Sequence, residues 1–325
     1  MSYLDSIFYI AIIPTWKCNF RCKACLRWKI LKHNDIPLEK WLKIIKNLKR
    51  NFSSDVFVEF NGGEPLLRKS AIIRMVKELK THFKRVVLNT NGFLLDEKTL
   101  LKLENAGLDA IKLSFYSLNR KTHNYLRGVN AYDATLSVIK KHQQLGLKIE
   151  LIIAILVTSK NIEEIPALIK FLLPLKRTNV RINALQETFS SENTFEYSKS
   201  ILPKDLWPAK DKTKKLFRWL ARYQDRIKTL KEHMKIIENY YRNPKSVLKI
   251  PCGVSKGSLI VHPSGRVGLC YSMPEFGSAL SDLKKILNSS VAQKQRKKIE
   301  NCKKCCRILT CSLVHQSRKS NQNIN

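Results

Sequence analysis

The stretch CNFRCKAC, residues 18–25, places Cys18, Cys22 and Cys25 in one short segment directly after an apolar run that ends at Pro14. Thiolates two to four residues apart are the ligands that an iron–sulfur cube takes from a single loop, and such a cube usually takes four of them. Only three are local, because the next cysteine is Cys252. A cube here is therefore expected to keep one iron open to a small molecule. A zinc-binding loop is the alternative, since C-x-x-C is also a common zinc signature.

Glycines and polar residues follow three further apolar runs. Residues 57–60 (FVEF) lead into NGGEPLL at 61–67, residues 86–88 (VVL) into NTNG at 89–92, and residues 111–113 (IKL) into SFYS at 114–117. Glycine at the end of a strand lets a ligand approach the backbone closely, because no Cβ shields the peptide groups. The repetition indicates that these strand ends share one role.

Hydrophobic periodicity predicts alternating strands and helices. Strands are expected near residues 8–14, 56–60, 85–89, 110–115, 148–157 and 179–184, and amphipathic helices near 38–51, 70–82, 96–106, 130–144 and 161–173. Strand-helix alternation predicts parallel pairing of the strands. All of the motifs above then lie at the carboxyl ends of strands, where barrel enzymes place their active sites.

These motifs together resemble the radical S-adenosylmethionine (radical SAM) superfamily, and the resemblance covers about the first two thirds of the chain. It implies an α/β fold, a partial (β/α)6 TIM-type barrel. It also implies that Cys18, Cys22 and Cys25 hold a [4Fe-4S] cluster whose open iron takes the amino and carboxylate groups of SAM. Reductive cleavage of SAM would then give a 5′-deoxyadenosyl radical, which abstracts a hydrogen atom from the substrate.

The same resemblance implies the SAM contacts. Gly62, Gly63 and Glu64 match the segment whose backbone receives the SAM amino group, and Glu64 is expected to be structural. Asn91 lies in the matching N-T-N-G segment, and Ser114 and Arg127 match positions that touch the ribose or carboxylate. A surface ion pair or a helix-end contact is the other interpretation of Arg127. Trp16 and Phe20 are expected to shield the cluster from water.

The C-terminal segment carries the other six cysteines. Cys252, Gly265 and Cys270, followed by Cys302, Cys305 and Cys311, resemble the SPASM/twitch extension of radical SAM enzymes. Two positions depart from the full SPASM pattern, since residue 315 is His and no cysteine follows Cys311. The departure implies one auxiliary [4Fe-4S] cluster, held by Cys252, Cys270, Cys302 and Cys305 with Cys311 as the alternative ligand. Cys306 matches no position of the pattern, and His315 as a nitrogen ligand and a zinc ribbon remain alternatives.

Three domains are predicted: a radical SAM partial barrel over residues 1–200, a helical connector over 201–248, and a small cysteine-rich auxiliary-cluster domain over 249–325. A long helical stretch is expected up to Arg242, with an apolar stripe of heptad spacing from Leu216 to Tyr241. Such a stripe usually marks one buried face, so packing within the chain is favoured over a coiled coil. Residues 257–270 are expected to form a hairpin around Pro-Ser-Gly.

The chain has 325 residues, nine cysteines and a formal net charge of +34. Clustered cysteines favour metal binding in a reducing compartment, and the short apolar start lacks the features of a signal peptide or membrane span, so a cytoplasmic enzyme is predicted. The charge is either background composition or a match to acidic partners, such as a flavodoxin or ferredoxin electron donor or an acidic substrate. Sequence-specific nucleic-acid binding is disfavoured, because no aromatic-basic RNA motif is evident.

The function expected from the resemblance is radical SAM chemistry in peptide or cofactor maturation. The first strand is predicted at the start of this sequence, so no N-terminal peptide-recognition domain is expected. One alternative is a radical SAM dehydrogenase or epimerase of a small alcohol or sugar. The other is a metal-stabilised nucleic-acid-binding module without turnover, which would hold zinc and bind in a salt-dependent way.

Overall fold

The computed structural model describes residues 3–25, 27–29, 34–186 and 204–308. Within these ranges all nine strands form one sheet, in the order β6-β5-β4-β3-β2-β1-β7-β8-β9. Strands β1 to β7 pair in parallel, and β8 and β9 add two antiparallel strands at one edge. The strands are β1 (Tyr9–Ile12), β2 (Phe57–Phe60), β3 (Arg85–Thr90), β4 (Ala110–Ser114), β5 (Glu150–Val157), β6 (Thr178–Ala184), β7 (Ser258–Val261), β8 (Arg266–Gly268) and β9 (Phe276–Ser278).

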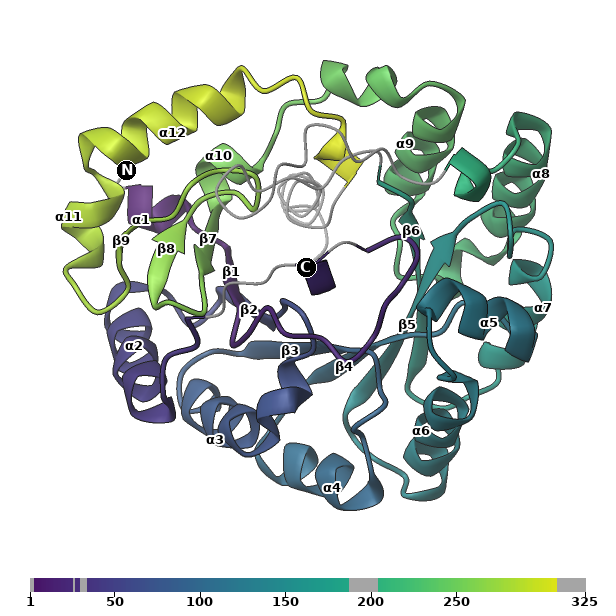
Figure 1. The fold of residues 1–325 in the computed structure, drawn as a ribbon, viewed down its shortest axis with the longest axis horizontal. Coiled ribbons are helices and arrows are strands. Elements are labelled where there is room, and N and C mark those ends of the chain that lie inside the picture. The colour runs from purple at the N-terminus through teal and green to yellow at the C-terminus, as the bar shows by residue number, and fades with distance from the viewer. Residues whose placement is uncertain (1–2, 26, 30–33, 187–203, 309–325) are drawn as a thin grey trace.

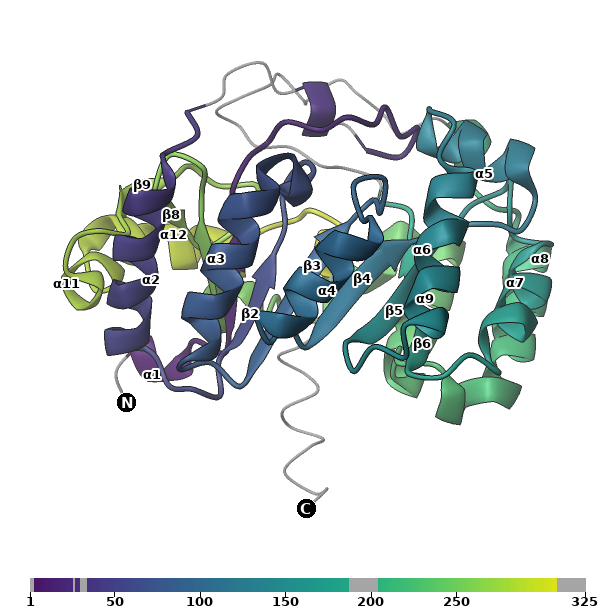
Figure 2. The same cartoon turned by 90° about the horizontal axis from the view of Figure 1, so that it is seen from below.

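Helices surround the curved sheet on its outer face (Figures 1 and 2). Those between successive strands, such as α2, α3, α4 and α6, make the right-handed crossovers that parallel strands require. The helices are α1 (Tyr3–Ser6), α2 (Leu38–Asn51), α3 (Lys69–Lys80), α4 (Glu97–Asn105), α5 (Arg120–Arg127), α6 (Tyr132–Gln144), α7 (Ile165–Leu172), α8 (Lys210–Leu220), α9 (Lys231–Arg242), α10 (Val254–Gly257), α11 (Leu283–Leu287) and α12 (Ser290–Glu300). The predicted α/β partial barrel, followed by a small cysteine-rich segment, is thus confirmed.

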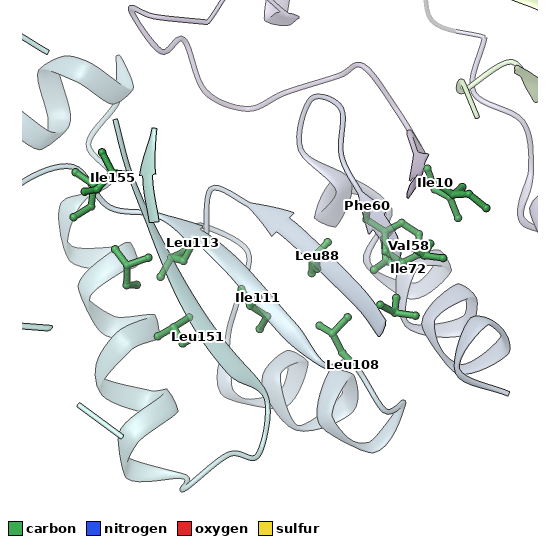
Figure 3. Close-up of a cluster of buried hydrophobic side chains, with 14 of the residues drawn as sticks. Ile10, Val58, Phe60, Ile72, Leu88, Leu108, Ile111, Leu113, Leu151 and Ile155 are labelled. Carbon is green, nitrogen blue, oxygen red and sulfur yellow. The ribbon is translucent and has the colours of Figure 1, made fainter. Parts of the chain in front are cut away.

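The two faces of the sheet differ because alternate residues of a strand point to opposite sides. Outward-facing residues such as Val58, Leu88, Ile111 and Leu151 pack beneath the helices in one large apolar cluster (Figure 3). Burial of this cluster supplies most of the apolar area that holds helices and sheet together. The strand residues between them therefore point into the barrel.

The interior of the barrel changes in character along the strands. Val87, Ala110 and Ile152, with Phe57 against them, form a small apolar cluster near the strand starts. Further along, the inward positions become polar or charged, as at Glu59, Lys112 and Arg181, which line a cavity. An apolar plug therefore closes one end and leaves the carboxyl ends of the strands for a ligand.

The predicted strands and the five predicted helices of the barrel are present, with ends displaced by a few residues. Helix α5 was not predicted. Its N-cap is Asn119, whose side chain accepts hydrogen bonds from Lys121 N and Thr122 N, and its C-cap is Gly128 in the left-handed conformation (φ 68°). Because α5 is short and mostly polar, few apolar residues mark it in the sequence, and its caps were the stronger signal.

The long helical stretch expected up to Arg242 is divided, so that expectation is wrong. Helix α8 ends at Leu220, a 3-10 segment follows, and α9 starts at Lys231. Between the 3-10 segment and α9 the backbone is extended. There Lys228 N donates to Val180 O, and the Thr229 hydroxyl group accepts from Ile182 N. The chain leaves the helix here because these bonds satisfy the otherwise unpaired edge of β6. The expected intramolecular packing is confirmed, since most of the stripe is buried.

The predicted C-terminal hairpin is formed by β7 and β8, with Gly265 at a positive φ of 76° in its turn. Strand β7 also pairs in parallel with β1, which precedes the Cys18 loop. The C-terminal segment thus continues the barrel sheet. Within the described residues, no helix is both long and apolar enough to cross a membrane.

Tyr241 ties α9 to the strand ends and gives a test of this packing. Its hydroxyl group donates to Val157 O (2.6 Å) and accepts from Leu185 N (2.8 Å), and the side chain is buried. Tyr241→Phe leaves both backbone groups unsatisfied, at about 1–3 kcal/mol each, so urea denaturation should show a lower free energy of unfolding. Tyr132→Phe is the matched control, because no described residue bonds to its hydroxyl group. Equal losses in the two variants would contradict this account.

Candidate active site

A cavity of about 400 Å³ lies at the carboxyl ends of the barrel strands. It is lined by residues from the cysteine loop and from the ends of several strands. All nine residues predicted to hold the first cluster or SAM are among them, namely Cys18, Cys22, Cys25, Gly62, Gly63, Glu64, Asn91, Ser114 and Arg127. Parallel strands explain the convergence, because their carboxyl ends meet at one edge of the sheet.

The cysteine loop is held against the end of β2 by backbone hydrogen bonds. Gly63 N donates to Thr15 O (3.0 Å) and Glu64 N donates to Lys17 O (2.8 Å). The two glycines allow this approach. A Cβ on Gly62 would lie 2.5 Å from Thr15 O, and one on Gly63 would lie 2.1 Å from Lys17 O. Because no side chain fits at either position, packing against the cysteine loop alone requires glycine at both.

Glu64 anchors the same turn from inside. Its carboxylate accepts hydrogen bonds from Leu66 N (2.9 Å), the Thr90 hydroxyl group (2.8 Å) and Asn91 N (2.8 Å). It therefore caps the 3-10 turn Pro65–Arg68 and links the end of β2 to the end of β3. These contacts are structural, as expected for Glu64. Burial raises the pKa of this carboxyl group, and the three donors oppose the rise.

The loop thiols have the surroundings of cluster ligands. Phe20 N donates to Cys18 Sγ at 3.4 Å, the kind of N–H···S bond that tunes iron–sulfur sites. Burial raises the pKa of Cys18 to about 11 and also raises the pKa of Cys25, with further contributions from the charge of Cys22. Three soft donors around one cavity fit an iron–sulfur cluster. Within the described residues, no group of three or more His, Cys, Asp or Glu side chains has the spacing to hold a single metal ion.

Arg127 is buried beside these thiols, so a surface ion pair does not explain it. Its guanidinium group donates to the Tyr116 hydroxyl group (2.9 Å) and lies over the rings of Tyr116 and Phe20 at 4.9 and 5.0 Å. Although burial opposes it, the nearby charges of Cys22, Tyr116 and Cys18 raise the pKa of Arg127 above its usual value. Its Nε has no hydrogen-bond partner within the described residues. The group is therefore a fixed cation with donor capacity left for an anionic ligand.

An aromatic stack joins the cysteine loop to the C-terminal segment. The guanidinium group of Arg27 lies over the rings of Trp16 and Tyr271, at 4.5 and 4.9 Å from their centroids. Arg27 follows Cys25 closely, and Tyr271 follows Cys270 directly. Trp16 and Phe20 are both buried, which agrees with a shielding role. Each cation–π contact is worth about 0.5–2 kcal/mol, so the stack helps to fix the wall of the cavity.

A second group of thiols gathers in the C-terminal segment. The charges of Cys252, Cys270 and Cys302 act on Cys306, and burial raises the pKa of Cys306 to about 12. Cys270 Sγ accepts from Ser272 N and Cys302 Sγ accepts from Lys304 N, both at 3.4 Å. Cys252, Cys270 and Cys305 all pack against the large apolar cluster. The structure thus adds Cys306, which matched no pattern, to the predicted cysteines; Cys311 and His315 lie outside the described residues.

Arg307 fixes this group of thiols by clamping three backbone carbonyl groups. Its guanidinium group donates to Leu248 O (2.7 Å), to Ile250 O, and to Cys302 O (2.6 Å). The first two precede Cys252 and the third belongs to the C-x-x-C loop. A single buried cation therefore holds two distant segments of chain in register around the thiols.

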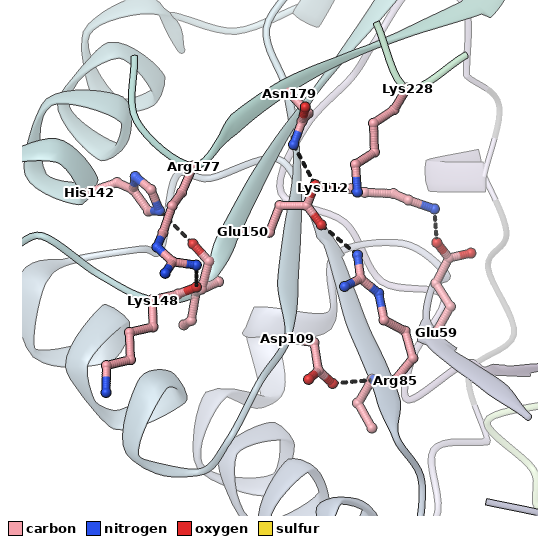
Figure 4. A network of polar contacts seen from close by, with 12 residues as sticks. Glu59, Arg85, Asp109, Lys112, His142, Lys148, Glu150, Arg177, Asn179 and Lys228 are labelled. Atoms are coloured by element: carbon pink, nitrogen blue, oxygen red, sulfur yellow. Dashed lines mark hydrogen bonds and ion pairs between the residues drawn. The ribbon is translucent and has the colours of Figure 1, made fainter. Parts of the chain in front are cut away.

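The charged residues of the barrel interior were not predicted as site residues. Glu59, Lys112 and Arg181 line the cavity, and Glu59 pairs with Lys112 (Figure 4). Tyr116, the partner of Arg127, was also missed as a site residue. A signal for Glu59 and Lys112 was present, because each is a single charge within a mostly apolar strand, which predicts either a buried pair or a ligand contact. Arg181 stands out less, because its strand carries several other polar residues.

Comparison with known families identifies the class of protein. Residues 12–172 match the radical SAM superfamily, and residues 252–307 match SPASM, an iron–sulfur cluster-binding domain. The chain therefore belongs to the radical SAM superfamily and carries a C-terminal SPASM domain. Membership makes a [4Fe-4S] cluster and SAM its cofactors, together with auxiliary iron–sulfur binding by the SPASM domain.

Curated relatives named GTP 3′,8-cyclases are similar to part of this chain. A probable GTP 3′,8-cyclase of Sulfurisphaera tokodaii is 29% identical over 203 residues, 60% of this chain and 62% of the relative. The GTP 3′,8-cyclase of Helicobacter pylori is 31% identical over 212 residues, 62% of this chain and 60% of the relative. The chain thus spans about three fifths of the length of these curated relatives.

Solved structures share the fold. SuiB of Streptococcus suis bound to S-adenosylmethionine superposes with a TM-score of 0.67 at 17% identity, covering 87% of this chain and 66% of that one. The anSMEcpe structure with bound AdoMet and a Cp18Cys peptide gives 0.61 at 15% identity, covering 94% and 88%. At these identities the likeness establishes the architecture alone.

Gly63→Ala tests the contact between the cysteine loop and β2. The added Cβ would collide with the carbonyl groups of Trp16 and Lys17, so the loop must move and the first cluster should be lost or weakened. We expect lower iron and sulfide content and a reduced cluster absorption after anaerobic reconstitution. Gly146→Ala is the control: its φ is also positive (59°), but nothing lies within 4 Å of the added atom. Equal iron content in the two variants would refute the steric argument.

Proposed function

We propose that this chain cleaves SAM reductively and uses the resulting radical to abstract a hydrogen atom from a substrate in peptide or cofactor maturation. One observation carries the proposal: the three loop cysteines and the six predicted SAM contacts, although distant in sequence, line a single cavity. An arrangement that served only to stabilise the fold would not need three thiols, two glycines and a buried arginine around an open space.

Each residue has a role in this proposal. When bound, the [4Fe-4S] cluster and SAM would supply a 5′-deoxyadenosyl radical for hydrogen abstraction. Cys18, Cys22 and Cys25 hold the cluster. The backbone at Gly62 and Gly63 receives the SAM amino group, and the fork of Arg127 receives its carboxylate. Asn91 and Ser114 are the remaining SAM contacts, while Trp16 and Phe20 keep water out.

The proposed substrate classes are taken from the names of the sequence relatives and of the structural neighbours. The sequence relatives are named GTP 3′,8-cyclases, and the structural neighbours include SuiB bound to precursor peptide SuiA. Peptide and cofactor precursors therefore both remain in the proposal. The electron would come from a reducing protein such as flavodoxin or ferredoxin, whose acidic surface suits a chain of net charge +34.

The domain limits and the second cluster are also proposals. We assign residues 1–200 to the barrel, 201–248 to the connector and 249–325 to the SPASM part. One auxiliary cluster would be held by Cys252, Cys270 and Cys302, with a fourth thiolate from Cys305, Cys306 or Cys311. Of these three, Cys306 has the support of its position among the other thiols.

The first experiment measures 5′-deoxyadenosine. Protein reconstituted anaerobically with iron and sulfide should form it from SAM and dithionite. Cys22→Ala should form none, because it removes a ligand of the first cluster but leaves the C-terminal cysteines in place. Absence of product from wild-type protein that has been shown to hold iron would refute the proposed function.

A second experiment assigns the fourth ligand of the auxiliary cluster. We expect Cys306→Ala to lose about four of about eight irons per chain, since its thiol lies with the other three. Cys305→Ala is the matched comparison, one residue away, and should keep them. Iron content and the electron paramagnetic resonance spectrum of the reduced protein report the outcome. Loss in Cys305→Ala alone would return the ligand set to the one that the C-x-x-C spacing predicted.

A further inference from the structure

The barrel interior carries more positive charge than its own side chains neutralise. Glu59 on β2, Lys112 on β4 and Arg181 on β6 each occupy an inward position and line the cavity. Bringing a charge into such an interior costs several kcal/mol unless the charge is paired. Two of the three residues neutralise each other, and the third does not have a partner among the described residues.

Glu59 and Lys112 satisfy each other. The Lys112 ammonium group donates to the Glu59 carboxylate, which also accepts from the Tyr9 hydroxyl group (2.7 Å) and from Asn61 Nδ2 (2.9 Å) (Figure 4). Burial alone would raise the pKa of Glu59, but Lys112 and the other donors hold it below the usual value. The carboxylate is thus ionised and fully bonded, and the pair is neutral as a unit.

Arg181 has no such partner. Within the described residues its guanidinium group makes no hydrogen bond and no ion pair, although the residue is partly buried and lines the cavity. Its pKa is lowered by burial, against the opposing charges of Glu59 and Tyr9. Arginine nevertheless stays protonated in proteins, so Glu59, Lys112 and Arg181 together carry one unbalanced positive charge.

We propose that Arg181 is the anchor for a carboxylate of the substrate. The inference rests on the proposed function, because it assigns the substrate's side of the same cavity. A guanidinium fork matches the two oxygens of a carboxylate, and a single excess positive charge matches a group of charge −1. A phosphate monoester carries about −1.5 to −2 and would leave negative charge buried beside Glu59.

Arg181 is placed apart from the residues assigned to SAM. The thiol charges act on Arg127, whereas the groups that act on Arg181 are Glu59 and Tyr9. Beyond Arg181 on the same strand, Asn183 also lines the cavity, as does Thr229 from the segment that covers β6. A carboxylate held at Arg181 would therefore leave the rest of the substrate between β6 and the thiol loop.

The test compares binding of two neutral-ended peptides that differ only in one charge. The probes are N-acetyl-Gly-Glu-Gly-amide and N-acetyl-Gly-Gln-Gly-amide, titrated by calorimetry into anaerobic, cluster-loaded protein with SAM and no reductant. Without reductant there is no turnover, so the result is independent of whether SAM is cleaved. Wild-type protein should bind the glutamyl peptide at least tenfold more tightly.

Two variants assign that preference to Arg181. Arg181→Gln should abolish the preference for glutamate, and Arg181→Lys should retain part of it, because the charge remains but the fork is lost. The thermal midpoint of Arg181→Gln should be equal to or above that of wild type, since no bond is broken and an unpaired charge is removed. Arg85→Gln is the control: Arg85 pairs with Glu150 outside this cavity, so the midpoint should fall while the preference remains.

The outcomes separate the competing assignments. Equal or absent binding of the two peptides overturns the proposal, as does an unchanged preference in Arg181→Gln. Weaker SAM binding by Arg181→Gln, with the preference intact, would place Arg181 on SAM. Tighter binding of inorganic phosphate than of the glutamyl peptide would overturn the carboxylate assignment in favour of a phosphorylated substrate. A negative 5′-deoxyadenosine assay, in contrast, would refute the proposed function without changing these affinities.

Discussion

The close approach of two backbones organises this molecule. The carbonyl groups of residues 15–17 lie so close to Gly62 and Gly63 that neither position has room for a Cβ, and two of them accept hydrogen bonds from the amide groups of Gly63 and Glu64. This contact sets the height of the cysteine loop above the barrel. The Glu64 carboxylate then links this turn to the end of β3 by hydrogen bonds from Thr90 and Asn91. The cavity exists because the loop is held above the strand ends at this distance.

An apolar layer of Val87, Ala110 and Ile152 crosses the interior of the barrel, between the Arg85–Glu150 ion pair at the strand starts and the charged residues of the cavity. Apolar surroundings strengthen the electrostatic interactions next to this layer. The pair of Glu59 with Lys112 is costly to bury and is weak support for stability. Its position across the barrel, between β2 and β4, instead gives the cavity a fixed arrangement of charge.

Much of the architecture could be predicted because period-two and helical patterns are local. The strands and barrel helices follow from these patterns, and the cysteine and glycine motifs could be placed at the strand ends. The division of α8 from α9 could not be predicted, since it depends on hydrogen bonds to the distant edge of β6. Cys306 was missed for a similar reason: its neighbours are Cys252 and Cys270, which tertiary structure alone brings to it. Arg181 does not stand out in the sequence, because its strand carries several other polar residues, and its lack of a partner could be seen only in the fold.

The pairing of β1 with β7 has a consequence for synthesis of the chain. Strand β1 has β2 on one side, but its other neighbour begins only at Ser258. While the ribosome makes the intervening residues, one edge of β1 exposes unpaired amide and carbonyl groups next to the cysteine loop. The nascent barrel is therefore open to aggregation, and its thiols to premature oxidation, until about four fifths of the chain has been translated. Rapid completion of the chain or early chaperone binding would therefore protect this protein more than one whose sheet closes from neighbouring segments.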